Sequence, residues 1–158
     1  MLALEPDSAQ TIQRVRPVVP VAPVSNDDHR PTAIVEQAHT ARLYFAFRIG
    51  SSAVVCLDAI AYVGRKPTIP RIVRGGLARL VRVASESNEV SATHLELRQS
   101  GTTVVAQDLN STNGTKVALP GFPVRTLRPG ESLVVSVGTL IDIGDRNVIE
   151  ILPQREIS

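Results

Sequence analysis

Short runs in which apolar and polar residues alternate dominate the chain after residue 41. The runs are Leu43–Ile49, Ala53–Leu57, Ala61–Val63, Leu80–Val83, His94–Arg98, Thr102–Ala106, Ser132–Ser136, Leu140–Ile143 and Val148–Leu152. Several keep a period of two, as a strand with one buried face requires, and turn residues separate them about every 8–12 residues. No window of about a dozen residues keeps a helical period. The pattern predicts an all-β sandwich of many short antiparallel strands over residues 41–153, with a short tail over 154–158.

The first 40 residues have a different composition. They hold five of the eleven prolines and no run of large apolar residues. Pro17, Pro20 and Pro23 recur every third residue, which favours polyproline II because each ring fixes φ and removes a backbone donor. We expect residues 1–40 to form a Pro-rich disordered tail or linker, and a spacer is favoured over a peptide ligand.

The composition of this 158-residue chain excludes several classes of protein. One cysteine, Cys56, allows no internal disulfide, and with three scattered histidines it provides no metal site of ordinary spacing. No apolar run approaches the roughly 20 residues that span a bilayer, so we expect no membrane insertion. Glu5 and Asp7 stand where a secretory signal would be basic, and we therefore expect a cytoplasmic protein.

The charge is unevenly distributed. Residues 1–40 carry a net charge of −2 and residues 41–158 a net charge of +4, for a formal total of +2. Between Asp58 and Glu86 the chain has six basic residues and no acidic one, namely Arg65, Lys66, Arg71, Arg74, Arg79 and Arg82. This stretch attracts an anionic partner. Specific nucleic-acid binding is disfavoured, because Tyr62 alone is aromatic there and leaves no platform for stacked bases.

Three turns between predicted strands carry polar residues that packing does not require. They are Gly64-Arg65, Ser91-Ala-Thr-His94 and Asp108-Leu-Asn-Ser-Thr-Asn-Gly-Thr115. Because the loops of a sandwich gather at its two ends, separate turns can converge on one ligand. Their guanidinium, hydroxyl and amide donors suit phosphate oxygens. Ser91 and His94 are also compatible with a nucleophile and its base, but no third group or nucleophile elbow accompanies them, so we expect no enzyme.

These motifs, in this order, resemble those of a forkhead-associated (FHA) domain, a phosphothreonine-peptide-binding β-sandwich. The similarity covers about residues 42–152 and includes Leu127-Arg-Pro-Gly-Glu131 and Leu140-Ile-Asp-Ile-Gly144. The resemblance implies a non-catalytic module, without cofactor or metal. Its partner would be a phosphothreonine-containing protein or peptide that a Ser/Thr kinase has phosphorylated.

The resemblance also implies a role for each motif residue. Arg65 and Ser91 are expected to bind the phosphate, and Thr112 or its neighbour Ser111 is expected to complete that pocket. Asn113 is expected to hold the backbone of the bound peptide through its two-sided amide. The remaining motif residues are expected to support the loops, namely Gly64, His94, Gly114 and Thr115. The two glycines are expected to do so through their backbone conformation.

Two departures from the family pattern bear on affinity. Ala92 stands where family members commonly place Arg, Lys or Asn, so one phosphate contact is missing. The segment 66–90 is longer than usual and basic. It is interpreted either as a flexible loop that supplies the missing charge or as a tolerated surface insertion.

Two further hypotheses follow from the same residues. A phosphate-independent structural subunit, for example in a secretion or cell-envelope assembly, would use the same fold, and Ala92 favours this alternative. Kinase modification of Thr11, Thr32 or Thr40 would let the domain bind its own tail or that of a neighbour, and the sequence favours none of the three.

Overall fold

The computed structural model describes residues 42–71 and 76–157. The predicted tail over 1–40 lies outside the described residues, as do its prolines and Thr11, Thr32 and Thr40. The described residues contain no helix and form eleven strands. The strands are β1 (Arg42–Ile49), β2 (Val55–Cys56), β3 (Ile60–Gly64), β4 (Ala78–Arg82), β5 (Leu95–Ser100), β6 (Thr103–Asp108), β7 (Thr115–Ala118), β8 (Arg125–Leu127), β9 (Ser132–Val135), β10 (Leu140–Asp142) and β11 (Val148–Ile157).

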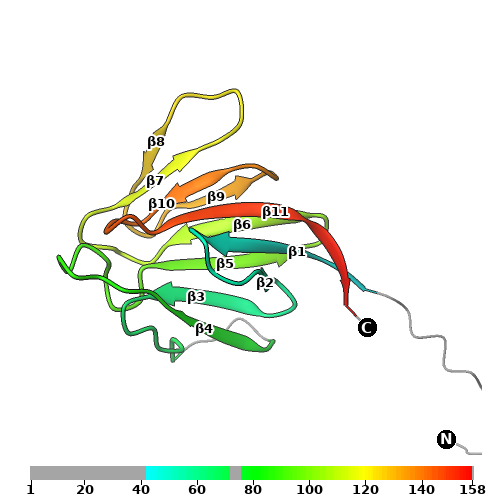
Figure 1. The fold of residues 1–158 in the computed structure, drawn as a ribbon, viewed down its shortest axis with the longest axis horizontal. Coiled ribbons are helices and arrows are strands. Elements are labelled where there is room, and N and C mark those ends of the chain that lie inside the picture. The colour runs from blue at the N-terminus through cyan, green and yellow to red at the C-terminus, as the bar shows by residue number, and fades with distance from the viewer. Residues whose placement is uncertain (1–41, 72–75, 158) are drawn as a thin grey trace, which may run out of the picture. The chain divides into compact units, whose positions relative to one another are not determined.

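The strands form two sheets whose inner faces share one core (Figure 1). The six-stranded sheet has the order β2-β1-β11-β10-β7-β8, and the five-stranded sheet has the order β4-β3-β5-β6-β9. Alternate residues face inward, as the period of two predicts. Phe47 and Ile151 from the first sheet and Leu95 and Leu97 from the second are fully buried, and burial of each such side chain stabilises the fold by roughly 1.5–3 kcal/mol. The predicted sandwich is confirmed.

One pair of strands is parallel, contrary to the antiparallel expectation. β3 and β4 pair from Ile60 opposite Ala78 to Gly64 opposite Arg82. Parallel neighbours need a crossover of about a dozen residues or more, and residues 65–77 provide it. The segment 66–90 is therefore not one long loop, because it contains the edge strand β4. The sequence did not indicate this direction, because apolar and polar residues alternate in the same way in parallel and in antiparallel strands.

The observed strands differ from the predicted ones in number and, most clearly for the last strand, in length. β7 and β8, of four and three residues, were not predicted. β11 continues to Ile157, since Glu156 and Ile157 pair with Leu43 and Arg42 of β1. Residues 154–157 thus extend a strand instead of forming the predicted C-terminal tail.

Thr139, between β9 and β10, has a buried hydroxyl without a hydrogen-bond partner in the described part of the chain. Such a group costs roughly 1–3 kcal/mol. We expect Thr139→Val, which replaces this hydroxyl with a methyl group, to raise the free energy of unfolding in urea by about 1 kcal/mol. The matched control is Thr115→Val, which should lower it because the Thr115 hydroxyl donates to Asp108 at 2.6 Å. A free energy for Thr139→Val at or below that of the wild type would contradict this account.

Candidate functional site

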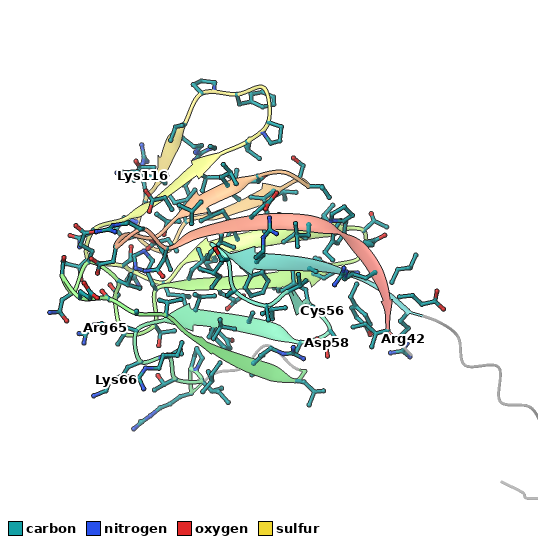
Figure 2. The ribbon with its side chains drawn as sticks, viewed as in Figure 1. Arg42, Cys56, Asp58, Arg65, Lys66 and Lys116 are labelled. Carbon is teal, nitrogen blue, oxygen red and sulfur yellow. The ribbon has the colours of Figure 1, made fainter. Side chains whose placement is uncertain are left out.

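The loops that carry the predicted site residues gather at one end of the sandwich. Figure 2 shows Arg65 and Lys66 at this end and Arg42 and Asp58 at the other. Four connections meet there: the segment after β3, the β4–β5 loop, the β6–β7 loop and the β10–β11 hairpin. Hydrogen bonds between them, described below, fix their relative positions.

The segment after β3 lies directly on the β4–β5 loop. The N–H of Arg65 donates to the carbonyl of Ser91 at 3.2 Å, and the N–H of Lys66 donates to that of Ala92 at 3.1 Å. A Cβ on Gly64 would lie 2.1 Å from the Ala92 oxygen. Gly64 is therefore required by close approach of two backbones, and not by an unusual φ as the sequence suggested.

Ser91 joins this pair to the β6–β7 loop. Its Oγ accepts the N–H of Thr112 at 3.0 Å and donates to the Thr112 hydroxyl at 3.4 Å. Arg65 and Thr112 are exposed and Ser91 is half-buried. Among the described residues, no carboxyl group lies within 4.0 Å of the Arg65 guanidinium. The three residues thus form one solvent-facing group of donors without a paired acid.

Ser111 faces the interior. It is 5% exposed, and its hydroxyl and N–H donate to the carboxyl oxygens of Asp108 at 2.5 and 2.9 Å. Thr115 donates to the same buried carboxyl group. Of the two residues expected to complete the phosphate pocket, Thr112 therefore has the accessible hydroxyl. Ser111 and Thr115 instead fix the shape of the β6–β7 loop around Asp108.

His94 connects the β4–β5 and β6–β7 loops on their buried side. The Ser91 N–H donates to its Nδ1 at 3.1 Å, and its Nε2 donates to the Gly114 carbonyl at 3.2 Å. These partners select the neutral tautomer with the proton on Nε2. The ring is fully buried, and this burial lowers its pKa from the ordinary value of 6.5. His94 lies behind the donors, where it positions Ser91.

The lowered pKa of His94 gives a pH dependence with a defined sign. The unfolded chain binds a proton at this ring at a pH where the folded chain does not, so the stabilisation is fully present above about 6.5 and decreases as the pH falls below it. We expect the free energy of unfolding in urea to fall between neutral pH and moderately acidic pH. The His94→Asn variant should show a smaller fall. Equal pH dependence in both proteins would contradict the neutral, buried ring.

Asn113 is exposed at the tip of the β6–β7 loop, and the half-buried Gly114 follows it. The Asn113 amide donates to the Glu89 carbonyl at 3.0 Å, which leaves its oxygen and a second N–H for a ligand. Gly114 has a φ of +79°, the conformation predicted for it from the Asn-Gly pair. The tip is thereby fixed to the β4–β5 loop while one face of the amide stays accessible.

The β10–β11 hairpin holds the β4–β5 loop in place, which the sequence did not predict. The Asp145 carboxyl group accepts the Ser85 hydroxyl and the N–H groups of Ser87 and Glu89, the latter two at 3.3 and 3.1 Å. The Ser85 hydrogen bond is the main cause that lowers the pKa of Asp145. Nothing in the sequence around Asp145 indicated partners 56–60 positions away.

The described residues include no group of His, Cys, Asp and Glu side chains that could hold a metal ion. No helix in residues 42–71 or 76–157 has the length and apolar character needed to cross a bilayer.

Comparisons with known proteins bear on the fold of this chain. Residues 62–144 match the family model described as FHA domain. The fold is similar to the FHA domain of CT664 from Chlamydia trachomatis (16% identity, 69% of this chain and 96% of that chain covered, TM-score 0.50). It is also similar to the FHA domain of an Arabidopsis thaliana protein (22%, 73% and 90%, 0.52). A third similar structure is the FHA domain of human APLF, solved with an XRCC1 bisphospho peptide (17%, 69% and 97%, 0.52). A search of curated proteins gives no match.

Proposed function

The chain belongs to the forkhead-associated (FHA) family, and from that premise we propose that it is a non-catalytic module that binds threonine-phosphorylated partner proteins in Ser/Thr kinase signalling. The observation that carries the proposal is the adjacency of Arg65, Ser91 and Thr112 at one loop end. A phosphothreonine brings a charge of about −1.5 to −2 at neutral pH. The phosphopeptide in the human APLF structure is consistent with this use of the fold.

Each residue has a distinct task in this proposal. Arg65 makes the forked, charge-assisted contact with two phosphate oxygens. The Thr112 hydroxyl donates to the third terminal oxygen, and the Ser91 hydroxyl, which donates to Thr112 in the free protein, turns to the phosphate when the peptide binds. Asn113 holds the peptide backbone with the free oxygen and N–H of its amide. His94 and the Asp108 network keep the two loops at the spacing that the phosphate needs. We place this binding in the cytoplasm, because that compartment supplies the ATP that Ser/Thr kinases need.

Ala92 limits the affinity of the proposed site. It is exposed beside Ser91, but its methyl group cannot donate to a phosphate. A charge-assisted contact contributes roughly 1.5–3 kcal/mol, so the absence of one weakens binding by roughly 10–100-fold. We therefore expect dissociation constants in the micromolar range.

Fluorescence polarisation with labelled peptide pools tests the proposal. One pool carries a fixed phosphothreonine between degenerate residues, and its twin carries threonine at that position. We expect saturable binding of the phosphorylated pool and at least about tenfold weaker binding of the twin. Equal binding of both pools would reject phosphate recognition.

A phosphate-independent interaction subunit is the second candidate, and an apolar hollow of about 520 Å³ favours it together with Ala92. Phe45, Leu119, Phe122 and Val134 line this hollow, and Phe122 is 70% exposed. Exposed apolar surface of this kind is typical of protein contacts. Capture of the same cellular partners by wild type and by Arg65→Ala would favour this candidate over phosphate binding.

A further inference from the structure

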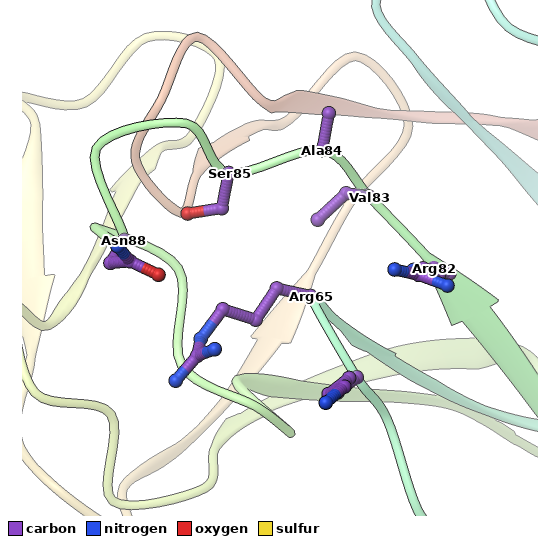
Figure 3. A pocket seen from close by; sticks show the side chains of 7 residues that line it. Arg65, Arg82, Val83, Ala84, Ser85 and Asn88 are labelled. Atoms are coloured by element: carbon purple, nitrogen blue, oxygen red, sulfur yellow. The ribbon is translucent and has the colours of Figure 1, made fainter.

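A basic hollow lies beside the proposed phosphate site. It has a volume of about 480 Å³, and its lining includes Lys66. Figure 3 shows four further lining residues, Arg65, Arg82, Ser85 and Asn88. None of the described residues that line it is acidic. None is aromatic either, so the hollow offers no surface on which a base could stack.

The parallel pairing of β3 and β4 explains why these cations gather. Parallel strands end at the same edge of a sheet, and here Gly64 pairs with Arg82. The N–H of Val83 donates to the Gly64 carbonyl at 3.0 Å, which keeps the two strand ends together. Arg82 therefore leaves β4 next to the point where Arg65 and Lys66 leave β3. Residues that are 16 or more positions apart become one cluster through this crossover.

Arg65, Lys66 and Arg82 form no salt bridge with any carboxyl group of the described residues. Arg79, three residues before Arg82 on β4, pairs with Asp58 at 2.9 and 3.0 Å. By contrast, no carboxyl group in the described ranges lies within 4.0 Å of the charged groups of Lys66 or Arg82. Asp145 accepts a hydrogen bond from Ser85, which lines the hollow, but its oxygens are also occupied by two backbone N–H groups. An anion in the hollow would relieve repulsion among like charges.

Neutral donors complete the hollow on its loop side. Asn88 has a φ of +56°, a left-handed conformation that asparagine tolerates, and its amide is exposed. The Ser85 hydroxyl is already committed, since it donates to Asp145 and accepts the N–H of Val90 at 3.0 Å. Lys66, Arg82 and the Asn88 amide are thus the groups that remain for a ligand once Arg65 holds the phosphothreonine.

Arg65 belongs to both places, because its backbone is bonded to Ser91 while its side chain lines the hollow. An extended peptide advances about 3.3 Å per residue, so residues close to the phosphothreonine can reach the hollow. We propose that Lys66, Arg82 and Asn88 bind a second anionic side chain of the same peptide, either an acidic residue or a second phosphorylated residue. This inference rests on the proposed function and adds a sequence preference to it.

The test uses phosphothreonine peptide pools whose other positions are degenerate but contain no Asp or Glu. In separate pools, each of about four positions on either side of the phosphothreonine is fixed as Gln, Glu or phosphoserine. We expect one position at which Glu tightens binding roughly threefold to fivefold over Gln, and phosphoserine roughly tenfold or more. A gain for both residues identifies a general acidic preference, whereas a gain for phosphoserine alone identifies a doubly phosphorylated ligand.

Variants locate the gain in the hollow. In the full chain carrying Lys66→Gln and Arg82→Gln, the gain should fall below about twofold, while the Gln pool still binds. The control Arg79→Gln removes one positive charge near the other end of β4 and should keep the full gain. The inference is overturned if no position favours an anion in the wild type, or if the double variant retains the gain. Absence of binding by the Gln pool to the wild type would instead reject the proposed function itself.

Discussion

Asp108→Ala is expected to lower the free energy of unfolding by about 3–5 kcal/mol in urea denaturation. The Asp108 side chain is fully buried and accepts three donors, the N–H and hydroxyl of Ser111 and the hydroxyl of Thr115. Alanine would leave all three without a partner in a site that water does not reach, and each unsatisfied donor costs roughly 1–3 kcal/mol. Because these donors shape the β6–β7 loop, peptide binding should weaken as well.

Two further variants serve as references for the loss of unfolding free energy in Asp108→Ala. Asp58→Ala removes a carboxyl group of the same size from an exposed pair with Arg79 and should cost less than about 1 kcal/mol. Asp108→Asn keeps one oxygen acceptor and should lie between the two. If Asp108→Ala costs no more than Asp58→Ala, the buried network does not stabilise the loop as described.

Arg65→Ala is expected to weaken binding of phosphothreonine peptides by about 10- to 100-fold or more and to leave the thermal midpoint nearly unchanged. The forked contact with the phosphate contributes roughly 1.5–3 kcal/mol. The side chain is exposed and forms no ion pair with the described residues, so the fold loses little when it is removed. Fluorescence polarisation and a thermal melt of the same sample measure both quantities.

Arg79→Ala is the control for the loss of one positive charge. It lies on the neighbouring strand β4, but its guanidinium pairs with Asp58 at the far end of the sandwich. Its affinity should stay within about twofold of the wild type. If both variants weaken binding equally, the effect comes from net charge, and Arg65 has no specific contact with the phosphate.

The alternation of apolar residues was sufficient to predict the fold class and most strands, because one buried face imposes a period of two wherever a strand is long enough. The alternation could not predict the direction of β4, because its parallel pairing with β3 depends on the connection between the two strands and not on any repeat within a strand. That direction places Arg82 beside Lys66. The clustering of basic residues beside the site therefore depends on the sheet topology, which the alternation does not indicate.

The candidate site was predicted in composition but not in detail. The ordered motifs named residues that the structure brings to one end, Arg65, Ser91 and Thr112 among them. The choice between Thr112 and Ser111 needed coordinates, because neighbouring hydroxyls differ only in which one faces the buried Asp108. The support from Asp145 was missed for a related reason, since its partners come from a loop 56–60 positions away.

The central claim is that three separate loops present their donors to one phosphate. A titration of the ¹⁵N-labelled chain, followed by amide chemical shifts, tests it most directly. The ligands are a phosphothreonine peptide from the binding pool and its unphosphorylated twin. We predict saturable shifts at the amides of Arg65, Ser91 and Thr112 with the phosphorylated peptide, none with its twin, and none near Asp58. Shifts confined to the far end or to the hollow around Phe122, or equal shifts with both peptides, would contradict the claim.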